Sequence, residues 1–139
     1  MKSDPAPHVL VVDNDAMIRF VLKLQLEERG YHVATSANGK EAIHFLRTTP
    51  EPHVALVDVV MPEMDGFDVL DTVARDPQLR QRHAFALMTG AYPRVAARTD
   101  RLLARLCAPV LLKPYDMDDL YTIVSLLAAR VNARPKSVA

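Results

Sequence analysis

The sequence predicts an α/β fold, a single domain in which five strands form one parallel sheet and five helices cover both of its faces. Short apolar runs recur along the chain, and their hydrophobicity is continuous, as in strands that are buried on both sides. Segments with the 3.6-residue period of amphipathic helices separate the runs. Strands that alternate with helices in this way form parallel sheets with right-handed crossovers.

Five segments are predicted to be strands. Four of them are continuous apolar runs, which read VLVV, VALVDVV, AFALM and VLL, and each run has the length of a strand. The segment YHVAT is more mixed in character and fits a strand at the edge of the sheet. In chain order, the predicted strands cover residues 9–12, 31–35, 54–60, 84–88 and 110–112.

Five helices are predicted between and after the strands. The last is the clearest, because apolar residues from Leu120 to Val131 follow the spacing i, i+3, i+4, i+7, i+8, i+11 of a stripe that faces a core. The first is expected to end at Gly30, since glycine suits a C-terminal cap. Its predicted buried side consists of Ile18, Val21, Leu22 and Leu26. The other helices are predicted at residues 38–46, 66–74 and 93–106.

Length and composition are those of one globular domain. The chain has 139 residues, of which 50% are hydrophobic and 24% are charged, and domains commonly have about 100–150 residues. We expect the domain at residues 9–132, with short tails at 1–8 and 133–139. Seventeen basic and seventeen acidic residues balance, so charge gives no reason to expect binding to nucleic acid or to a membrane. One cysteine and the lack of an apolar signal segment fit a cytoplasmic protein.

Polar residues gather where the predicted strands end, and ligands of such folds bind outside the carboxyl ends of the strands. Asp58 is the ionisable residue of its apolar run, and the segment MPEMDG that follows it is typical of a sharp turn. In that turn proline fixes one dihedral angle, Asp65 can cap the next helix, and Gly66 tolerates positive φ. The other residues at this edge are Asp13, Asn14, Asp15, Thr89, Gly90 and Lys113.

These residue types suit phosphoryl transfer. Carboxylates that converge in a partly buried site repel one another unless they take up protons or share a cation. Lys113 offsets one charge, and Mg²⁺ held by one or two carboxylates, a main-chain carbonyl and water would satisfy the rest. The metal and Lys113 would screen the phosphoryl oxygens, Thr89 would donate a hydrogen bond to one of them, and a carboxylate is a competent nucleophile.

The motifs VLVVDND, LVDVVMPEMDG, ALMTG and LLKP, in this order and at these spacings, resemble the receiver domain of two-component response regulators. The resemblance covers residues 9–131. It implies a doubly wound, flavodoxin-like sheet with the strand order 2-1-3-4-5. It also implies that Asp58 accepts a phosphoryl group from a histidine kinase or a phosphotransfer protein and that the domain then acts on a downstream effector protein.

The same resemblance assigns roles to the residues around Asp58. The reaction that it implies is confined to the protein itself, namely phosphorylation of Asp58 and its reversal. The peptide bond between Lys113 and Pro114 is commonly cis in the family. The implied Mg²⁺ ligands are Asp13, Asp58 and the backbone carbonyl of Val60, and the implied phosphoryl-binding residues are Thr89, Gly90 and Lys113.

Three features depart from the family pattern. Asn14 replaces an acidic metal ligand, so we expect weaker Mg²⁺ binding, and Asp15 is either a helix N-cap or an outer-sphere helper of the metal. Val110 stands where an aromatic ring often moves on activation, and valine has no ring and few rotamers. Val60 and Ala91 are apolar where polar groups in relatives assist water, which predicts slow hydrolysis of the phosphoryl group.

A basic stripe is predicted on the fourth helix. Its members are Arg94, Arg98, Arg101 and Arg105, which recur at the spacing i, i+4, i+7, i+11. In receivers the surface made by the fourth helix, the fifth strand and the fifth helix commonly meets a partner or a second receiver. The stripe is therefore either a docking site for an acidic partner or a homodimer, or a solvated helix face.

The remaining polar side chains are expected to have surface or packing roles. The five histidines lie far apart in sequence and show no metal-ligand spacing. Tyr92 and Tyr115 could either replace the missing aromatic switch or serve in packing.

Two other functions fit parts of the sequence. The triplet Asp13-Asn14-Asp15 also resembles the D-x-D motif of haloacid dehalogenase-like phosphohydrolases, in which Asp13 would be the nucleophile. That interpretation leaves Asp58 and the MPEMDG turn unexplained. The other alternative is a degenerate receiver that binds partners without phosphorylation, and it draws on Asn14 and Val110.

Overall fold

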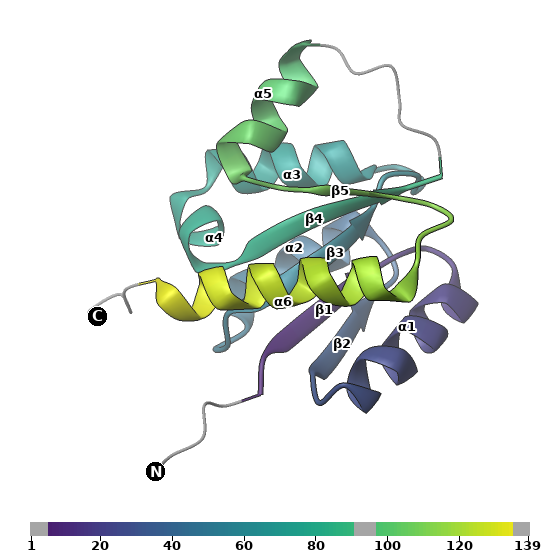
Figure 1. Cartoon of the computed structure of the whole chain (residues 1–139). Coiled ribbons are helices and arrows are strands. Elements are labelled where there is room, and N and C mark those ends of the chain that lie inside the picture. The colour runs from purple at the N-terminus through teal and green to yellow at the C-terminus, as the bar shows by residue number, and fades with distance from the viewer. Residues whose placement is uncertain (1–5, 91–96, 135–139) are drawn as a thin grey trace.

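The computed structural model describes residues 6–90 and 97–134, and for residues 97–99 it describes the backbone only. Within these ranges five strands form one parallel sheet in the order β2-β1-β3-β4-β5 (Figure 1). The predicted fold class and the strand order implied by the family resemblance are therefore confirmed. The strands are β1 (His8–Val12), β2 (His32–Ser36), β3 (His53–Asp58), β4 (Ala84–Thr89) and β5 (Val110–Leu112).

The prediction of five helices was wrong by one. The described residues form α1 (Ala16–Glu28), α2 (Gly39–Thr48), α3 (Gly66–Arg75), α4 (Pro77–Arg82), α5 (Ala97–Leu106) and α6 (Met117–Ala133). The additional helix is α4, which is too short to show a helical period in the sequence. Its start nevertheless carries two standard signals, because Asp76 accepts a hydrogen bond from the Gln78 N–H as N-cap and Pro77 occupies the first turn.

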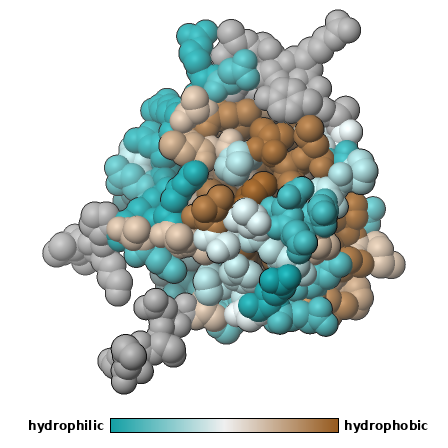
Figure 2. All heavy atoms as spheres, in the orientation of Figure 1, coloured by the Kyte–Doolittle hydropathy of each residue, from teal (hydrophilic) through white to brown (hydrophobic). Residues whose placement is uncertain are grey.

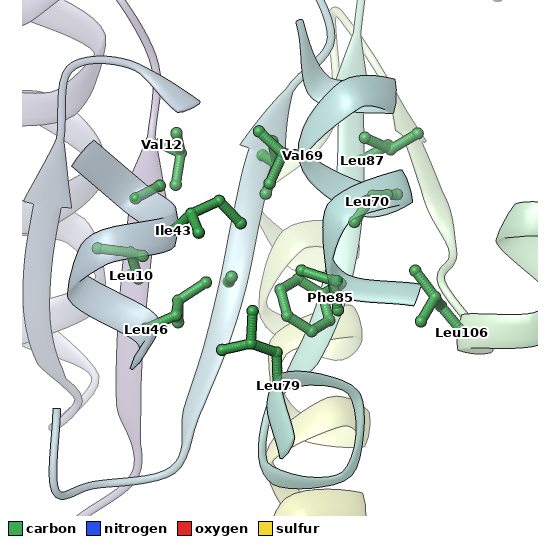
Figure 3. Packing of buried hydrophobic residues seen from close by; sticks show 14 of the residues in the cluster. Leu10, Val12, Ile43, Leu46, Val69, Leu70, Leu79, Phe85, Leu87 and Leu106 are labelled. Carbon is green, nitrogen blue, oxygen red and sulfur yellow. The ribbon is translucent and has the colours of Figure 1, made fainter. Parts of the chain in front are cut away.

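Two apolar layers bury the sheet. Helices α1 and α6 cover one face, and α2, α3, α4 and α5 cover the other (Figure 1). Successive strand residues point to opposite faces, so Val9 packs in the layer beneath α1 and α6 while Leu10 packs in the other. Figure 3 shows the second layer, in which side chains of β1 and β4 meet those of α2, α3, α4 and α5. A sheet enclosed in this way leaves its carboxyl edge as the place where polar side chains meet.

Helix α1 ends where predicted, and Ile18, Leu22 and Leu26 of its predicted buried side pack in the core. Gly30 has a φ of 91°, and the N–H groups of Gly30 and Tyr31 donate to the carbonyls of Glu27 and Leu26, which is the hydrogen-bond pattern of a Schellman cap. The prediction that Val21 is buried was wrong, because it is exposed. It belongs instead to an outer apolar row, here called the α1 stripe, which consists of Met17, Phe20, Val21 and Leu24.

The α1 stripe is an unusual surface for a helix of a small domain. Its residues follow the spacing i, i+3, i+4, i+7, and the Phe20 side chain is 60% exposed. Figure 2 shows hydrophobic residues on the surface at the position where α1 lies in Figure 1. A contiguous exposed apolar row of this kind marks a contact surface more often than a chance arrangement. No helix in the described ranges has both the length and the apolar character needed to cross a membrane.

Candidate functional site

The carboxyl edge of the sheet brings the predicted site residues together from four strands. Asp13 follows β1 directly and is 1% exposed, while Asp58 ends β3 and is 8% exposed. Thr89 ends β4 and is buried, and Lys113 follows β5. Residues separated by up to a hundred positions in sequence therefore share one small polar region, because parallel strands all end at the same side.

Lys113 lies between the two carboxylates. Its Nζ is 3.4 Å from Oδ1 of Asp58 and 3.6 Å from Oδ2 of Asp13. Its backbone N–H donates to the carbonyl of Thr89 at 2.7 Å, which fixes the chain at the point where the side chain departs. The Lys113–Pro114 peptide bond is cis. One ammonium thus faces two carboxylates, and the site keeps an excess of negative charge.

The pKa of Asp58 shows the effect of that excess. Burial raises this pKa above its ordinary value, and the charge of Asp13 raises it further. The Lys113 ammonium and a hydrogen bond from the Val60 backbone N–H act in the opposite direction but do not cancel the increase. The same two carboxylates affect Tyr115. Burial raises the pKa of its phenol, and the charges of Asp13 and Asp58 raise it further. Its ring also packs against the apolar layer beneath α6.

The oxygens of Asp13 show where a cation fits. Oδ1 accepts a hydrogen bond from the backbone N–H of Asp15 at 2.8 Å. Among the described residues, Oδ2 is buried and has no hydrogen-bond partner, which is costly for a charged oxygen. The described part of the chain holds no cluster of three His, Cys, Asp or Glu side chains suited to a metal. Mg²⁺ needs only one or two carboxylates with carbonyls and water, so the donor set of this edge fits Mg²⁺.

The turn after Asp58 depends on a close approach at Gly66. The Gly66 N–H donates to the carbonyl of Val59 at 2.9 Å. A Cβ at this position would lie 2.6 Å from the carbonyl oxygen of Asp58 and 2.9 Å from Cα of Val59. The expectation that Gly66 supplies positive φ was wrong, since in this turn the non-glycine residue Glu63 has the positive φ, at 69°. Glycine is needed here because the helix start touches the backbone of Asp58.

Both helix starts at the site are capped by aspartates. Asp15 accepts hydrogen bonds from the N–H groups of Met17 and Ile18, which confirms the N-cap interpretation of this residue. Asp65 and Asp68 form a reciprocal capping box at the start of α3. The loop after β1 is also held by Arg19, whose Nη1 donates to the Asp13 carbonyl at 2.7 Å.

The other predicted positions lie around this centre. Asn14, Gly90 and Val60 are exposed, and the side chain of Val110 is partly buried against the layer beneath α2 and α3. Arg101 and Arg105 are exposed on α5. Three predicted positions, Ala91, Tyr92 and Arg94, lie outside the described residues, and so does the side chain of Arg98.

Comparison with known proteins agrees with this geometry. Residues 9–125 match the family model of the response regulator receiver domain. The chain is 33% identical over 128 residues to the two-component response regulator ORR3 of Oryza sativa subsp. indica, with 92% of each chain covered. A CheY-like response regulator receiver domain protein from Methanospirillum hungatei JF-1 has a TM-score of 0.79 at 28% identity, with 92% of this chain and 98% of that one covered.

A second solved structure carries a ligand. The response regulator protein TrrA from Thermotoga maritima, in complex with Mg²⁺–BeF, has a TM-score of 0.69 at 29% identity to this chain. The match covers 87% of this chain and 98% of the other.

Proposed function

Because the chain belongs to the response regulator receiver domain family of two-component systems, we propose that it is a switch driven by phosphorylation of Asp58. The observation that carries the proposal is the contact of Lys113 with both Asp58 and Asp13 at the carboxyl edge. A carboxylate that ends a buried strand beside an ammonium and a second carboxylate has the surroundings that a phosphoryl acceptor needs.

In the proposed reaction an oxygen of Asp58 attacks the phosphorus atom of a phosphohistidine. The new P–O bond forms as the bond from phosphorus to the donor imidazole nitrogen breaks, and that nitrogen keeps the electron pair. Lys113 offsets the charge on the phosphoryl oxygens, while the Thr89 hydroxyl and the Gly90 backbone N–H donate hydrogen bonds to them. The donor is a histidine kinase or a phosphotransfer protein.

Mg²⁺ is part of the proposal, and its ligands would be Asp13, Asp58 and the backbone carbonyl of Val60. When bound, it would neutralise charge that Lys113 alone leaves unbalanced. The buried Oδ2 of Asp13 supports this assignment, because it accepts no hydrogen bond and has only the Lys113 ammonium at 3.6 Å as an ion-pair contact among the described residues. The Thermotoga maritima relative was solved with Mg²⁺–BeF. Asn14 brings an amide where the family has an acid, so we propose that Mg²⁺ binds more weakly than in relatives with the acid.

Slow hydrolysis of the phosphoryl group is also proposed. The side chain of Val60 is 72% exposed beside Asp58, so it occupies the region from which water would approach but has no polar atom to orient that water. A phosphoryl group that persists for minutes or longer is expected.

Two surfaces are proposed for partners. The α1 stripe begins four residues after Asp13, so it borders the site and offers an apolar row for the protein that delivers the phosphoryl group. The downstream effector, or a second copy of the domain, is assigned to the surface of α5, β5 and α6. Arg101 and Arg105 are exposed there on α5 and would attract an acidic partner.

The decisive experiment is phosphorylation by a small donor. We expect the protein incubated with Mg²⁺ and acetyl phosphate to gain one phosphoryl group, located at Asp58 by peptide mass analysis. The Asp58→Asn variant should remain unlabelled. Turnover that requires Asp13 and spares Asp58 would instead indicate a phosphohydrolase, and no reaction under any Mg²⁺ concentration would indicate a degenerate receiver.

A second measurement separates donor docking from chemistry. Phe20→Ser and Leu24→Ser in the α1 stripe should leave labelling by acetyl phosphate unchanged, because that donor needs no protein surface. They should slow transfer from a phosphorylated histidine kinase that phosphorylates the wild type. Equal transfer rates would remove the α1 stripe from the proposal and leave Asp58 in place.

A further inference from the structure

Four histidines form a row at the end of the sheet opposite to Asp58. His32, His8 and His53 begin β2, β1 and β3, and His83 directly precedes β4. The strand register places His8 level with both His32 and His53, so their side chains share the face covered by α2. Neighbouring ring centroids along the row are separated by 4.9, 5.2 and 6.1 Å. These residues are far apart in sequence, and only the parallel pairing of the strands unites them.

The row runs from solvent into the core. His32 is exposed, His8 is partly buried, His53 is 3% exposed and His83 is 0% exposed. Phe45 of α2 meets His53 edge-on at 5.0 Å, and Phe85 meets His83 edge-on at 6.4 Å. Phe45 and Phe85 have no lone pair to accept an additional imidazole proton, and they present their edges rather than their faces, so the inner half of the row lies in apolar surroundings.

Hydrogen bonds define the protonation state of His83. Its Nδ1 accepts the backbone N–H of His53 at 3.0 Å, so Nδ1 carries no proton. Its Nε2 lies 2.9 Å from the carbonyl of Leu46 and must donate to it. Both ring nitrogens are therefore used by a single neutral tautomer. A second proton would point Nδ1–H at the N–H of His53 and would break the link.

The charges around the inner histidines disfavour a second proton as well. Arg82 precedes His83 in the chain, and Nη1 of Arg134, the residue that caps the C-terminus of α6, donates to the His83 carbonyl at 2.6 Å. The pKa of His83 is lowered to about 4, chiefly by burial and also by the charges of Arg82, His53 and Arg134, while the hydrogen bond to Leu46 opposes the decrease.

The environment of His53 acts in the same direction. Burial lowers the pKa of His53, and His8 and Arg82 add to that effect. Glu51 opposes it with its charge and with its carbonyl, which accepts the Nδ1–H of His53 at 2.7 Å. Arg47 of α2 and Asp76, the N-cap of α4, are paired with each other at 3.5 Å.

We propose that this histidine row is an acid-sensitive latch, in which neutral His83 ties the last turn of α2 to the starts of β3 and β4 and releases it as the pH falls. Leu46, whose carbonyl receives the bond, lies in that last turn, and its side chain packs with Leu79 and Phe85 in the layer that the latch closes (Figure 3). The latch is independent of Asp58 and adds pH as a second input to the domain.

The direction of the pH effect follows from the protonation states. A histidine exposed in the open state has a pKa of about 6.5, whereas the pKa of His83 in the closed latch is about 4. The stabilising contribution is therefore complete above pH 6.5 and is lost progressively as the pH falls toward 4. Between pH 7 and pH 5 the equilibrium constant for opening should rise about 20-fold for one proton taken up on opening.

Amide hydrogen exchange of the wild-type chain tests the proposal. We expect the opening constants of the last α2 amides and of His53, corrected for intrinsic exchange rates, to rise about 20-fold between pH 7 and pH 5. His83→Gln should open more readily at pH 7 but show almost no further increase at pH 5. His44→Gln is the matched control, because His44 is an exposed histidine of the same helix, and it should follow the wild type.

Two results would overturn the latch. The first is a wild-type opening constant that changes less than twofold between pH 7 and pH 5, or a His83→Gln variant with the wild-type pH dependence. The second result is the protonation state of His83 in the wild-type protein, which can be measured even if the His83→Gln variant does not fold. Long-range ¹H–¹⁵N spectra should show His83 as the neutral Nε2–H tautomer at pH 6, and a protonated ring at that pH would contradict the proposal.

Discussion

Replacing Gly66 by alanine should damage the site through the backbone of Asp58. The added Cβ would lie 2.6 Å from the Asp58 carbonyl oxygen and 2.9 Å from Cα of Val59, whereas unstrained heavy-atom contacts are about 3.5 Å or longer. The overlap of roughly 0.9 Å falls on backbone atoms, which cannot rotate away as a side chain would. The turn between β3 and α3 must therefore open and carry Asp58 with it.

The cost can be approximated from two opposing effects. Overpacking typically costs about 1–3 kcal/mol, and the upper end applies because the contacted atoms are backbone. Alanine regains up to about 1 kcal/mol through its better helix propensity. The net loss is about 2 kcal/mol, which is roughly a 30-fold change in the folding equilibrium. With a urea m-value of about 2 kcal/mol/M, the unfolding midpoint should fall by about 1 M.

The assay pairs urea unfolding with the rate of labelling by acetyl phosphate. A displaced Asp58 carboxylate should slow labelling at least about tenfold, since a misplacement of about 1 Å can cost roughly 100-fold. Gly39→Ala is the matched control, because a Cβ there would meet side-chain atoms of Val69 and Met64 at 2.7 and 2.9 Å. Those side chains can shift, so stability should fall by less than half as much and labelling should stay within about twofold.

Two patterns of results would contradict the close approach at Gly66. If Gly66→Ala unfolded at the wild-type urea concentration and were labelled at the wild-type rate, the close approach would not determine the position of Asp58. If both variants lost the same stability and the same labelling rate, glycine at position 66 would have no special connection to the acceptor.

Three further predictions concern the acidic site. Burial and the charge of Asp13 raise the pKa of Asp58, so the folded state disfavours the charged form and gains stability as the pH falls through that pKa. Asp58→Asn should therefore raise the urea midpoint at pH 7. A lower midpoint would contradict the excess of negative charge around Asp58. Asn14→Asp should tighten Mg²⁺ binding measured by calorimetry, because it restores one formal charge; equal affinities would show that the amide is not limiting. Val60→Asn should shorten the lifetime of the phosphoryl group on Asp58, followed by loss of the label, whereas a wild-type lifetime of seconds would remove the idea of slow hydrolysis.

Several features of this protein were readable from local sequence patterns. Continuous apolar runs identify β1, β3, β4 and β5, because a strand covered on both faces must be apolar on both faces. Asp58 lies at the end of such a run, where an ionisable residue is unexpected because the strand is buried on both faces. In a parallel sheet all strand ends on one side meet, so the positions of Asp13, Asp58, Thr89 and Lys113 at strand ends predict that they converge, as the structure confirms.

Other features escaped local reasoning for identifiable reasons. The six residues of α4 are too few to show a helical period. Val21 was assigned to the buried side of α1 because both sides of that helix carry apolar residues, and hydrophobicity alone does not say which side faces the sheet. The distances from Lys113 to its two carboxylates depend on how neighbouring strands are placed against one another. The same placement leaves Oδ2 of Asp13 buried without a hydrogen bond.

The sequence by itself determined the fold class, the succession of strands and the set of chemical groups at the carboxyl edge, because these follow from local periodicity and from the position of polar residues at strand ends. Only the tertiary structure decided that Gly66 is required for contact with the Asp58 backbone and that four scattered histidines form a row. Both depend on the register and close packing of segments that are distant in the chain, and no local pattern of residues records those relations.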